Sequence, residues 1–302
     1  MKLQKMRQYL HKLAAFLWHR RLIQYFIPTE LYLSVQYKNY MGKSLNLKHP
    51  QTFNEKLQWL KIYDRNPKYT NLVDKYEVRN YIARTIGEKF LIPIYGVYQN
   101  YEDIEFDRLP EEFVLKPNHT SGDVYICRNK SDINHCQLKR MVKRWLRKRY
   151  YWVHREWPYK NIKPRIICEK YMVDESGSEL KDYKFMCFNG RVKCLFVCRN
   201  RNSASGLNVD FYDTDWKPLP FIRHYPNSGE ILPKPKNFDQ MKKFAEVLAK
   251  EIPCVRIDFY EVEEILYFGE MTFYPGSGYE EFSPETYDYM LGDWLTLPDY
   301  GG

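Results

Sequence analysis

The sequence predicts an α+β fold with antiparallel sheets, on three observations. Helical spacing of apolar residues dominates up to about residue 100. From residue 112 the chain changes to short runs of β-forming residues separated by turns, and two helical patterns interrupt those runs. With 302 residues, 44% of them apolar and 17% aromatic, the chain has enough material to bury a core of one large or two modest domains.

The first 26 residues predict a basic amphipathic helix. Leucines and methionines recur on one helical face, and lysines and arginines occupy the other faces. Charge interrupts this segment, and no apolar run in the chain approaches the ~20 residues that cross a bilayer, so we expect neither a secretory signal nor a membrane span. Such a helix either rests on anionic lipid or packs on its own domain.

Two further helices are expected before residue 90. In residues 51–63, Thr52 and Glu55 have the spacing of a capping box, ahead of apolar residues at helical intervals. A second pattern covers residues 71–87, where Gly87 stands in the position of a C-terminal cap.

The predicted strands are short and read as antiparallel neighbours. After an extended segment at 90–98 they cover residues 112–116, 123–127, 165–172, 182–188, 191–198, 208–213, 255–262 and 265–273. Two helices interrupt them, a strongly basic one over 138–157 and another over 237–252 with Asn237 as its N-cap. We therefore expect a basic helical segment over 1–50, a helix-rich region over 51–110 and a β-rich domain over 111–302.

Charge and cysteine usage narrow the class of protein. A formal net charge of +9 suggests an anionic partner, which nucleic acid, a phosphate ligand, an acidic polysaccharide or a membrane surface would all satisfy. The seven cysteines form an odd number and include no CxxC pair. We expect buried, chemically inert thiols in a reducing cytosol, ahead of zinc or nucleophilic roles.

The clearest chemical signal lies in the last pair of strands. Asp258 and Glu270 fall on consecutive strands of a predicted hairpin, with Arg256 and Thr272 close by. Charge inside a strand is costly unless it is paired or bound to a metal. Two carboxylates and a hydroxyl can hold Mg²⁺, which takes oxygen ligands and bridges nucleotide phosphates, or the acids can form a buried ion pair. The loop that follows, with Ser277, can contact a substrate.

Two other segments carry weaker signals. Lys116 ends a strand before a small polar loop, and such a hairpin can lay backbone N–H groups and a lysine over phosphate oxygens. His119 in that loop either contacts phosphate or substrate or orders the loop by a hydrogen bond. The apolar strand that leads into Glu169 and Met172 can hold an adenine edge, or it is an edge strand that turns polar as it leaves the core.

Taken in order, these segments resemble the ATP-grasp superfamily, in its TupA-like branch associated with teichuronopeptide and other surface-polysaccharide synthesis. The resemblance covers roughly residues 50 to 290, through “TFNEKLQWLKIYDR”, “LVDKYEVRNYI”, “LIPIYGV”, “FVLKPNH”, “DYKFMCFNG”, “VRIDFY” and “YFGEMTFYPGSG”. It implies two α+β subdomains whose antiparallel sheets clamp ATP, with the catalytic domain over 111–302.

The resemblance also implies the nucleotide contacts. By position they are Lys75, Lys116, Glu169, Lys170, Met172, Asp182 and Lys184. The first two match the family's phosphate lysines, the next three match the adenine hinge, and the last two match a ribose contact and a phosphate contact.

A metal site and catalytic groups follow from the same resemblance. Asp258 and Glu270 match the family's Mg²⁺ ligands, while Thr272 stands where the family has asparagine. Arg256 matches the arginine that steadies the acyl phosphate, and Lys116 acts with it in catalysis. The implied mechanism transfers the γ-phosphoryl of ATP to a carboxylate, and an amine then displaces phosphate to give an amide.

We therefore expect an ATP- and Mg²⁺-dependent ligase that joins an amino acid or amine to an acidic, uronic-acid-type surface polysaccharide or its precursor. The basic stretch over 139–155 would attract that acidic glycan or a lipid-linked glycan precursor, or it is a solvated basic face without a ligand. The expected location is the cytoplasm, with peripheral contact at the inner face of the membrane.

Three alternatives remain open at this point. Asp213 and Asp215 form a DxD arrangement that can hold a metal and a sugar diphosphate in a glycosyltransferase. A sugar kinase of the same fold would stop at phosphoryl transfer. Basic and aromatic residues together at 144–157 suggest a nucleic-acid-binding protein, but no RNA- or DNA-binding motif supports that reading, so we expect no nucleic-acid partner.

Overall fold

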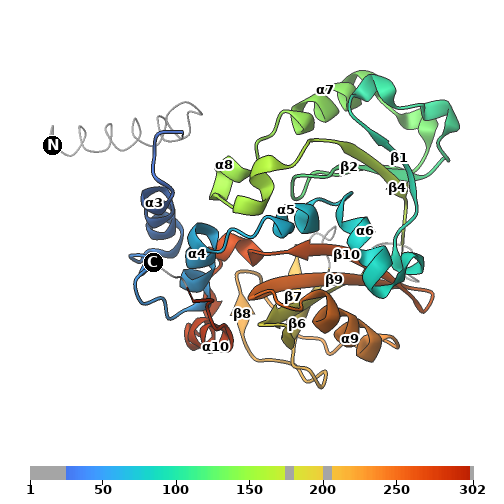
Figure 1. Cartoon of the computed structure of the whole chain (residues 1–302). Coiled ribbons are helices and arrows are strands. Elements are labelled where there is room, and N and C mark those ends of the chain that lie inside the picture. Colours follow the sequence, from blue (N-terminus) through green and yellow to red (C-terminus); the bar gives the residue numbers. More distant parts are fainter. Residues whose placement is uncertain (1–24, 174–179, 200–205, 300–302) are drawn as a thin grey trace, which may run out of the picture.

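The computed structural model describes residues 25–173, 180–199 and 206–299. The predicted N-terminal amphipathic helix therefore lies almost wholly outside the described residues. Within them, two antiparallel sheets form the two halves of the molecule (Figure 1). No described helix is long and apolar enough to cross a bilayer.

The smaller sheet, in the upper half of Figure 1, has four antiparallel strands. Its order is β1-β4-β2-β3, made of β1 (Ile94–Tyr98), β2 (Phe113–Pro117), β3 (Tyr125–Cys127) and β4 (Ile166–Lys170). In β2, Phe113 and Leu115 pack in one core cluster with residues of α7 (His135–Leu146), while Val114 and Lys116 point to the other face. The sheet thus gives one face to its helix and keeps the other for a cavity.

The larger sheet has five antiparallel strands in the order β10-β9-β5-β6-β7. They are β5 (Asp182–Phe188), β6 (Arg191–Arg199), β7 (Asn208–Tyr212), β9 (Cys254–Val262) and β10 (Ile265–Thr272). Helix α9 (Phe238–Leu248) covers one face with a row of fully buried apolar residues. A two-stranded ladder joins β8 (Ile222–Arg223) to β11 (Phe282–Ser283). The predicted strands and their antiparallel order are confirmed.

Asn237 precedes α9 as predicted, but its side chain does not cap that helix. Its amide donates to Glu261 Oε2 and to the carbonyl of Glu264. The residue therefore ties the start of α9 to the β9–β10 hairpin.

The single helix predicted over 71–87 is wrong, because the chain is interrupted there. Helix α5 (Lys68–Val73) ends before Asp74, and α6 (Val78–Ile82) continues through a wider turn at Ala83–Gly87. The carboxylate of Asp74 accepts from the backbone N–H groups of Tyr76 and Glu77, and the amide of Asn118 donates to it. A side chain that competes for backbone donors in this way ends a helix.

The predicted basic helix over 138–157 is likewise two helices. Helix α7 ends at Leu146, and a short helix α8 (Tyr151–His154) follows after four residues that are not helical. Arg155 then takes a left-handed conformation with φ of 57°, which turns the chain and ends α8.

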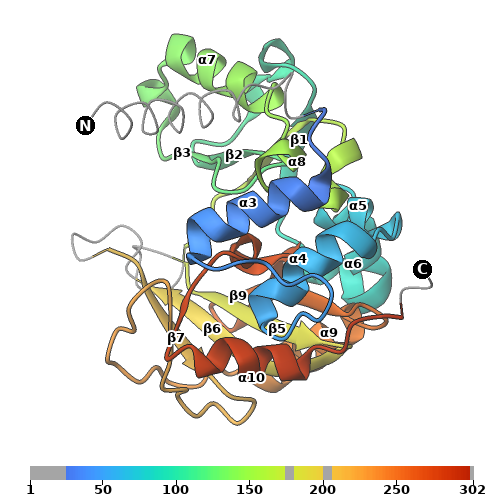
Figure 2. The ribbon, with the colours of Figure 1, turned by 90° about the vertical axis from the view of Figure 1, so that its left-hand side faces the viewer.

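Helix α4 (Phe53–Tyr63) begins with the predicted capping box. The backbone N–H of Glu55 donates to Thr52 Oγ1, and the Glu55 carboxylate accepts from the N–H of Thr52. Figure 2 shows α4 on one side of the molecule with α3 (Thr29–Met41) and α10 (Thr286–Trp294). Lys56 joins α4 to α10 by donating to the carbonyls of Gly292 and Leu295, both at 2.8 Å. Helix α10 was not predicted from the sequence.

The predicted regions 51–110 and 111–302 share the smaller sheet. Strand β1 lies in the first of these ranges, yet it pairs with β4 along its length. The division at residue 110 therefore runs through the smaller sheet. Whether the two regions are separate folding units stays a prediction.

Candidate active site

A cavity of about 710 Å³ lies between the two sheets, a size typical of small-molecule sites. Both sheets and the loops at their edges contribute to its wall. Of the thirteen residues predicted from sequence, all but Asp258 and His119 line it: Lys75, Lys116, Glu169, Lys170, Met172, Asp182, Lys184, Arg256, Glu270, Thr272 and Ser277.

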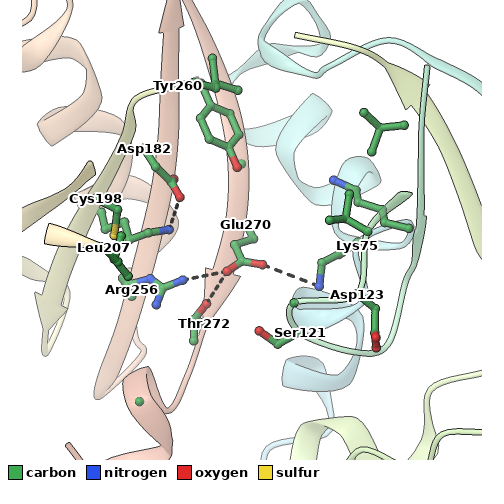
Figure 3. Close-up of a pocket in the computed structure, with 18 of the residues that line it drawn as sticks. Lys75, Ser121, Asp123, Asp182, Cys198, Leu207, Arg256, Tyr260, Glu270 and Thr272 are labelled. Atoms are coloured by element: carbon green, nitrogen blue, oxygen red, sulfur yellow. Dashed lines mark hydrogen bonds and ion pairs between the residues drawn. The ribbon is translucent and has the colours of Figure 1, made fainter. Parts of the chain in front are cut away.

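On the larger sheet, Arg256 joins the two predicted metal-ligand acids. Its Nε donates to Asp258 Oδ1 and its Nη2 to Asp258 Oδ2, both at 2.7 Å. The same Nη2 lies 2.7 Å from Glu270 Oε1, and Thr272 Oγ1 donates to that oxygen at 3.1 Å. Figure 3 shows Glu270 between Arg256 on one side and Lys75 on the other, with Thr272 next to its carboxylate. Asp258 is fully buried beneath this layer.

A β-bulge aims Glu270 at the cavity. The pairing of β10 with β9 shifts by one residue between Phe268 and Met271. Before the shift Phe268 faces the core, and after it Met271 faces the core, so Glu270 and Thr272 turn to the cavity. With strict alternation Glu270 would share the buried face of Phe268. Bulges often re-aim a side chain beside a functional site in this way.

Strand β5 adds a second layer of charge to the same wall. Lys184 lies 2.6 Å from Asp182 Oδ2 and also contacts Asp258 Oδ2. Burial opposes the charged form of Lys184, but the two carboxylates outweigh burial and raise its pKa. Asp182, Lys184 and Asp258 thus form a buried network in which each charge has an opposite partner.

Two lysines lie on the opposite wall, Lys116 from the smaller sheet and Lys75 from the break between α5 and α6. Lys75 stands at the break between α5 and α6, and its Nζ donates to the carbonyl of Thr120 at 2.7 Å. The same Nζ lies 3.7 Å from Glu270 Oε2 (Figure 3). Lys116 at the end of β2 pairs with Glu169 Oε2 at 2.5 Å. Burial lowers the pKa of Lys75, which marks it as a desolvated cation.

These cations set the charge state of Glu270. Burial alone would raise its pKa, but Lys75 and Arg256 outweigh burial and hold that pKa well below its usual range. Glu270 is therefore ionised at any neutral pH, as a metal ligand must be.

The loop between β2 and β3 forms a rim beside Lys75. Ser121 and Asp123 line the cavity there, as Figure 3 shows. Asp123 accepts from Thr120 Oγ1 and pairs with Lys148 at 2.6 Å, which ties the loop to the segment after α7. His119 is buried behind this loop, with Nδ1 at 3.2 Å from Asn118 Oδ1. Its position favours the loop-ordering role over a contact with substrate.

The opposite end of the cavity is apolar. Ile92, Val114 and Met172 line it beside Glu169. The backbone N–H of Lys170 donates to the carbonyl of Pro93 at 2.9 Å, which joins β4 to the segment before β1. An apolar slot with a few polar groups at its edge suits a flat heterocycle.

The oxygen donors of Asp258, Glu270 and Thr272 fit Mg²⁺ in part. The set is right in type, with two carboxylates and a hydroxyl, but both oxygens of Asp258 already contact Arg256 or Lys184. Within residues 25–173, 180–199 and 206–299, no cluster of three or more His, Cys, Asp or Glu side chains could hold a metal. The residues therefore fit an ion that takes most of its ligands from phosphate oxygens and water.

Several lining residues were not predicted from the sequence, and Glu156 is the clearest example among them. It lies in the turn after α8 and is 4% exposed. The signal that could have found it is its isolation, because it is the sole acidic residue between Asp132 and Glu169 in a strongly basic stretch. Tyr150, Tyr159 and Arg223 also line the cavity and carry no sequence motif.

A family model described as TupA-like ATPgrasp matches residues 55–296. The chain belongs to the TupA-like ATP-grasp family. The predicted family, fold class and enzyme class are thereby confirmed, so the cavity between the sheets is the candidate active site of an ATP-grasp enzyme. Our search of curated proteins found no match.

Solved structures with a similar arrangement include ATP-grasp enzymes. D-alanine–D-alanine ligase from Bacillus anthracis complexed with ATP is 18% identical, with 67% of this chain and 55% of that chain covered and a TM-score of 0.40. ATP-grasp ligase PsnB complexed with minimal precursor, Mg and ADP is 10% identical, with 72% and 57% covered and a TM-score of 0.38.

N5-carboxyaminoimidazole ribonucleotide synthetase from Thermus thermophilus is 13% identical, with 67% of this chain and 45% of that chain covered and a TM-score of 0.37. The chain thus spans about half the length of these structures. Likenesses at this level carry no information on the substrate of this chain.

The DxD pair of the glycosyltransferase alternative lies away from the cavity wall. Asp213 Oδ1 accepts from the backbone N–H groups of Asp215 and Lys217, so it closes the turn after β7. An aspartate used in this way is typical of a turn. The geometry therefore gives the DxD reading no support.

Proposed function

We propose that this chain is an ATP-dependent carboxylate–amine ligase that works with Mg²⁺ through an acyl phosphate. The observation that carries the proposal is the position of Glu270, an ionised acid between Arg256 on one wall and Lys75 on the other. An acid that faces cations across a cavity suits a site where a cation and phosphate oxygens are bound together.

The residues would divide the work by position. The apolar end beside Met172 would hold adenine, with Asp182 near the ribose. Lys75, Lys116 and Lys184 would neutralise the phosphates, and Asp258, Glu270 and Thr272 would hold Mg²⁺, which supplies positive charge to the transferring phosphoryl group. Arg256 would stabilise the charge that develops on the acyl phosphate and on the tetrahedral species that follows it.

We further propose an acidic, uronic-acid-type surface glycan or its lipid-linked precursor as the carboxylate, and an amino acid or amine as the nucleophile. Helix α7 supports an anionic partner, because Arg140 and Arg144 are exposed on it. Its other two cations, Lys139 and Lys143, lie 2.9 and 3.2 Å from Glu102 and are already paired. An inner-membrane location through the N-terminal segment stays a prediction.

One assay separates the ligase from the rival activities. The protein receives Mg²⁺, ATP, uronic acids or polygalacturonate, and a mixture of amino acids, and nucleotides and phosphate are followed. A ligase yields ADP with free phosphate and an amide, whereas a sugar kinase yields ADP with phosphate kept on the sugar. A glycosyltransferase leaves ATP untouched, and that result would refute the proposal.

A further inference from the structure

Glu156, Ser277, Tyr150 and Tyr159 form a further part of the cavity wall, here called the Glu156 end. The ATP contacts proposed above do not use these residues. An inference about this end rests on the proposed ligase function, because it concerns the second substrate of that reaction.

Helix α4 fixes the loop that carries Ser277. Gly276, Ser277 and Gly278 all have left-handed backbone conformations, with φ of 58°, 52° and 64°. The carbonyl of Ser277 accepts from Gln58 Nε2 at 3.0 Å and from Lys61 Nζ at 2.8 Å. A strained segment that is held from outside in this way presents its side chain in one direction.

That direction is toward Glu156, whose carboxylate accepts a hydrogen bond from Ser277 Oγ. In the part of the chain that the structure describes, no cation lies within ion-pair distance of Glu156. A buried carboxylate without a paired cation is costly, and it gains most when a ligand supplies the cation. Glu156 thus differs from Asp182, Asp258 and Glu270, which are all paired.

The cation whose charge acts on this acid from another element is Lys61 of α4, and Lys61 Nζ donates to the carbonyl of Ser277. Burial raises the pKa of Glu156 and lowers the pKa of Lys61, while the attraction between the two opposes both shifts. Ser277 Oγ donates to Glu156, and burial and the charge of Glu156 raise the pKa of Tyr150, Tyr159, Tyr274 and Tyr279.

Tyr150 lies within the electrostatic reach of both Glu156 and Glu270. Burial raises the pKa of Tyr150, and the negative charges of both Glu156 and Glu270 raise it further. Burial and the same two acids raise the pKa of Tyr159, and the ring centroids of Tyr159 and Tyr150 lie 4.8 Å apart. Glu156, Glu270 and these two tyrosines thus line one cavity, and the charges of both acids reach both phenols.

We propose that Glu156 binds the ammonium group of the amine substrate and accepts a proton from it, held in position by Ser277. The free amine then attacks the carbonyl carbon of the acyl phosphate, so that a C–N bond forms. The C–O bond to phosphate breaks, and phosphate leaves with that electron pair. Of the two protons that nitrogen loses, Glu156 takes the first and the leaving phosphate takes the second.

The test uses two nucleophiles on the full-length protein with Mg²⁺, ATP and galacturonate oligomers. Amino acids arrive as ammonium ions and need the base, whereas hydroxylamine is uncharged at neutral pH and traps an acyl phosphate without one. In Glu156→Gln we expect amide formation to fall about 100-fold, as loss of a general base does, while hydroxamate and ADP formation stay within about twofold of the native protein.

Two further variants complete the test. Glu285→Gln, an exposed acid paired with Lys43, should change neither product. Ser277→Ala keeps the contact between its carbonyl and Lys61 but removes the hydroxyl that donates to Glu156. Because Glu156 is then less well positioned, KM for the amine should rise while hydroxamate formation persists.

Each other outcome decides against the inference. Equal loss of amide and hydroxamate in Glu156→Gln would make Glu156 structural, and retention of both would make it unnecessary. If the native protein forms neither product with any uronic acid, the proposed function fails and this inference fails with it.

Discussion

At the scale of single residues, the cavity stands out because its acids do not behave alike. Asp258 is buried and bound twice by Arg256, whereas Glu270 is ionised and touches cations on both walls. At Asp258 burial raises the pKa despite Arg256 and Lys184, whereas at Glu270 Lys75 and Arg256 outweigh burial and lower the pKa. Glu270 is therefore the residue on which the proposed chemistry depends most.

We predict that Glu270→Gln lowers ADP release by at least about 100-fold, because the amide cannot supply the negative charge that a metal ion needs. The fold should persist, since Gln can still accept from Thr272 Oγ1. Glu264→Gln, at the exposed turn of the same hairpin, is the matched control. Undiminished ADP release in Glu270→Gln would remove the residue from the site.

We predict that Lys116→Ala weakens ATP binding by about tenfold, the effect of one lost charge-assisted hydrogen bond. Its loss also leaves Glu169 without its cation at the edge of the nucleotide end. Calorimetric titration with a nonhydrolysable ATP analogue measures the change. Lys193→Ala, an exposed lysine on β6, should bind as the native protein does, and unchanged affinity in Lys116→Ala would contradict the assignment.

At the scale of elements, the site depends on three interruptions of regular structure. The break between α5 and α6 places Lys75, the bulge in β10 turns Glu270, and the left-handed turn at 276–278 aims Ser277. The first and the last are held by polar contacts with segments far away in sequence. The functional side chains therefore stand where regular helix or strand stops.

Gly278→Ala tests the turn that carries Ser277. A Cβ at this position would lie 2.5 Å from Gln58 Nε2, and φ is +64°, so the variant should lose roughly 1–3 kcal/mol of stability. Gly229→Ala has a similar φ of +77° but open space around it, and it should lose less. Thermal unfolding of the two variants compares them. Equal losses would show that the contact with α4 is not needed.

The sequence predicts which segments are helices and which are strands, but it does not predict the three interruptions of regular structure. The strands follow from runs of β-forming residues, and α4 follows from Thr52 and Glu55, because those signals are local. The break at Asp74 depends on Asn118, and the turn at Ser277 depends on Gln58, so neither can be read from its own neighbourhood. Glu156 shows the same limit, since its contact with Ser277 spans a long stretch of chain.

At the scale of the whole molecule, buried histidine links stability to pH. His119 is 3% exposed, and burial lowers its pKa to about 4, below the ~6.5 of an unfolded chain. As the pH falls, the unfolded chain takes up the proton first. Stability is therefore fully present above about pH 6.5 and is lost toward pH 4, by up to about 3 kcal/mol for this residue.

Urea unfolding at pH 7.5, 6.0 and 5.0 checks this expectation. The native protein should lose stability across the series, and His119→Gln should show a shallower loss because its side chain does not titrate. His49→Gln, an exposed histidine, should keep the native slope. If stability depends on pH in the same way in His119→Gln as in the native protein, other groups control acid unfolding.

The family, the fold class and eleven of the lining residues were predictable from the sequence, because the motifs lie in one order along the chain and the family match covers residues 55–296. The contacts between the two walls were not. Lys75 and Glu270 are almost 200 residues apart in sequence, and only the folded chain brings them to 3.7 Å.

That contact across the cavity has a consequence for ligand entry. An incoming polyphosphate would draw Lys75 to itself, and Glu270 would then be free for a metal cation. Lys75 and Glu270 already form an ion pair, so the exchange would swap one counter-ion for another. The opposite charges that a polyphosphate and a metal cation would meet are thus already in place on the two walls.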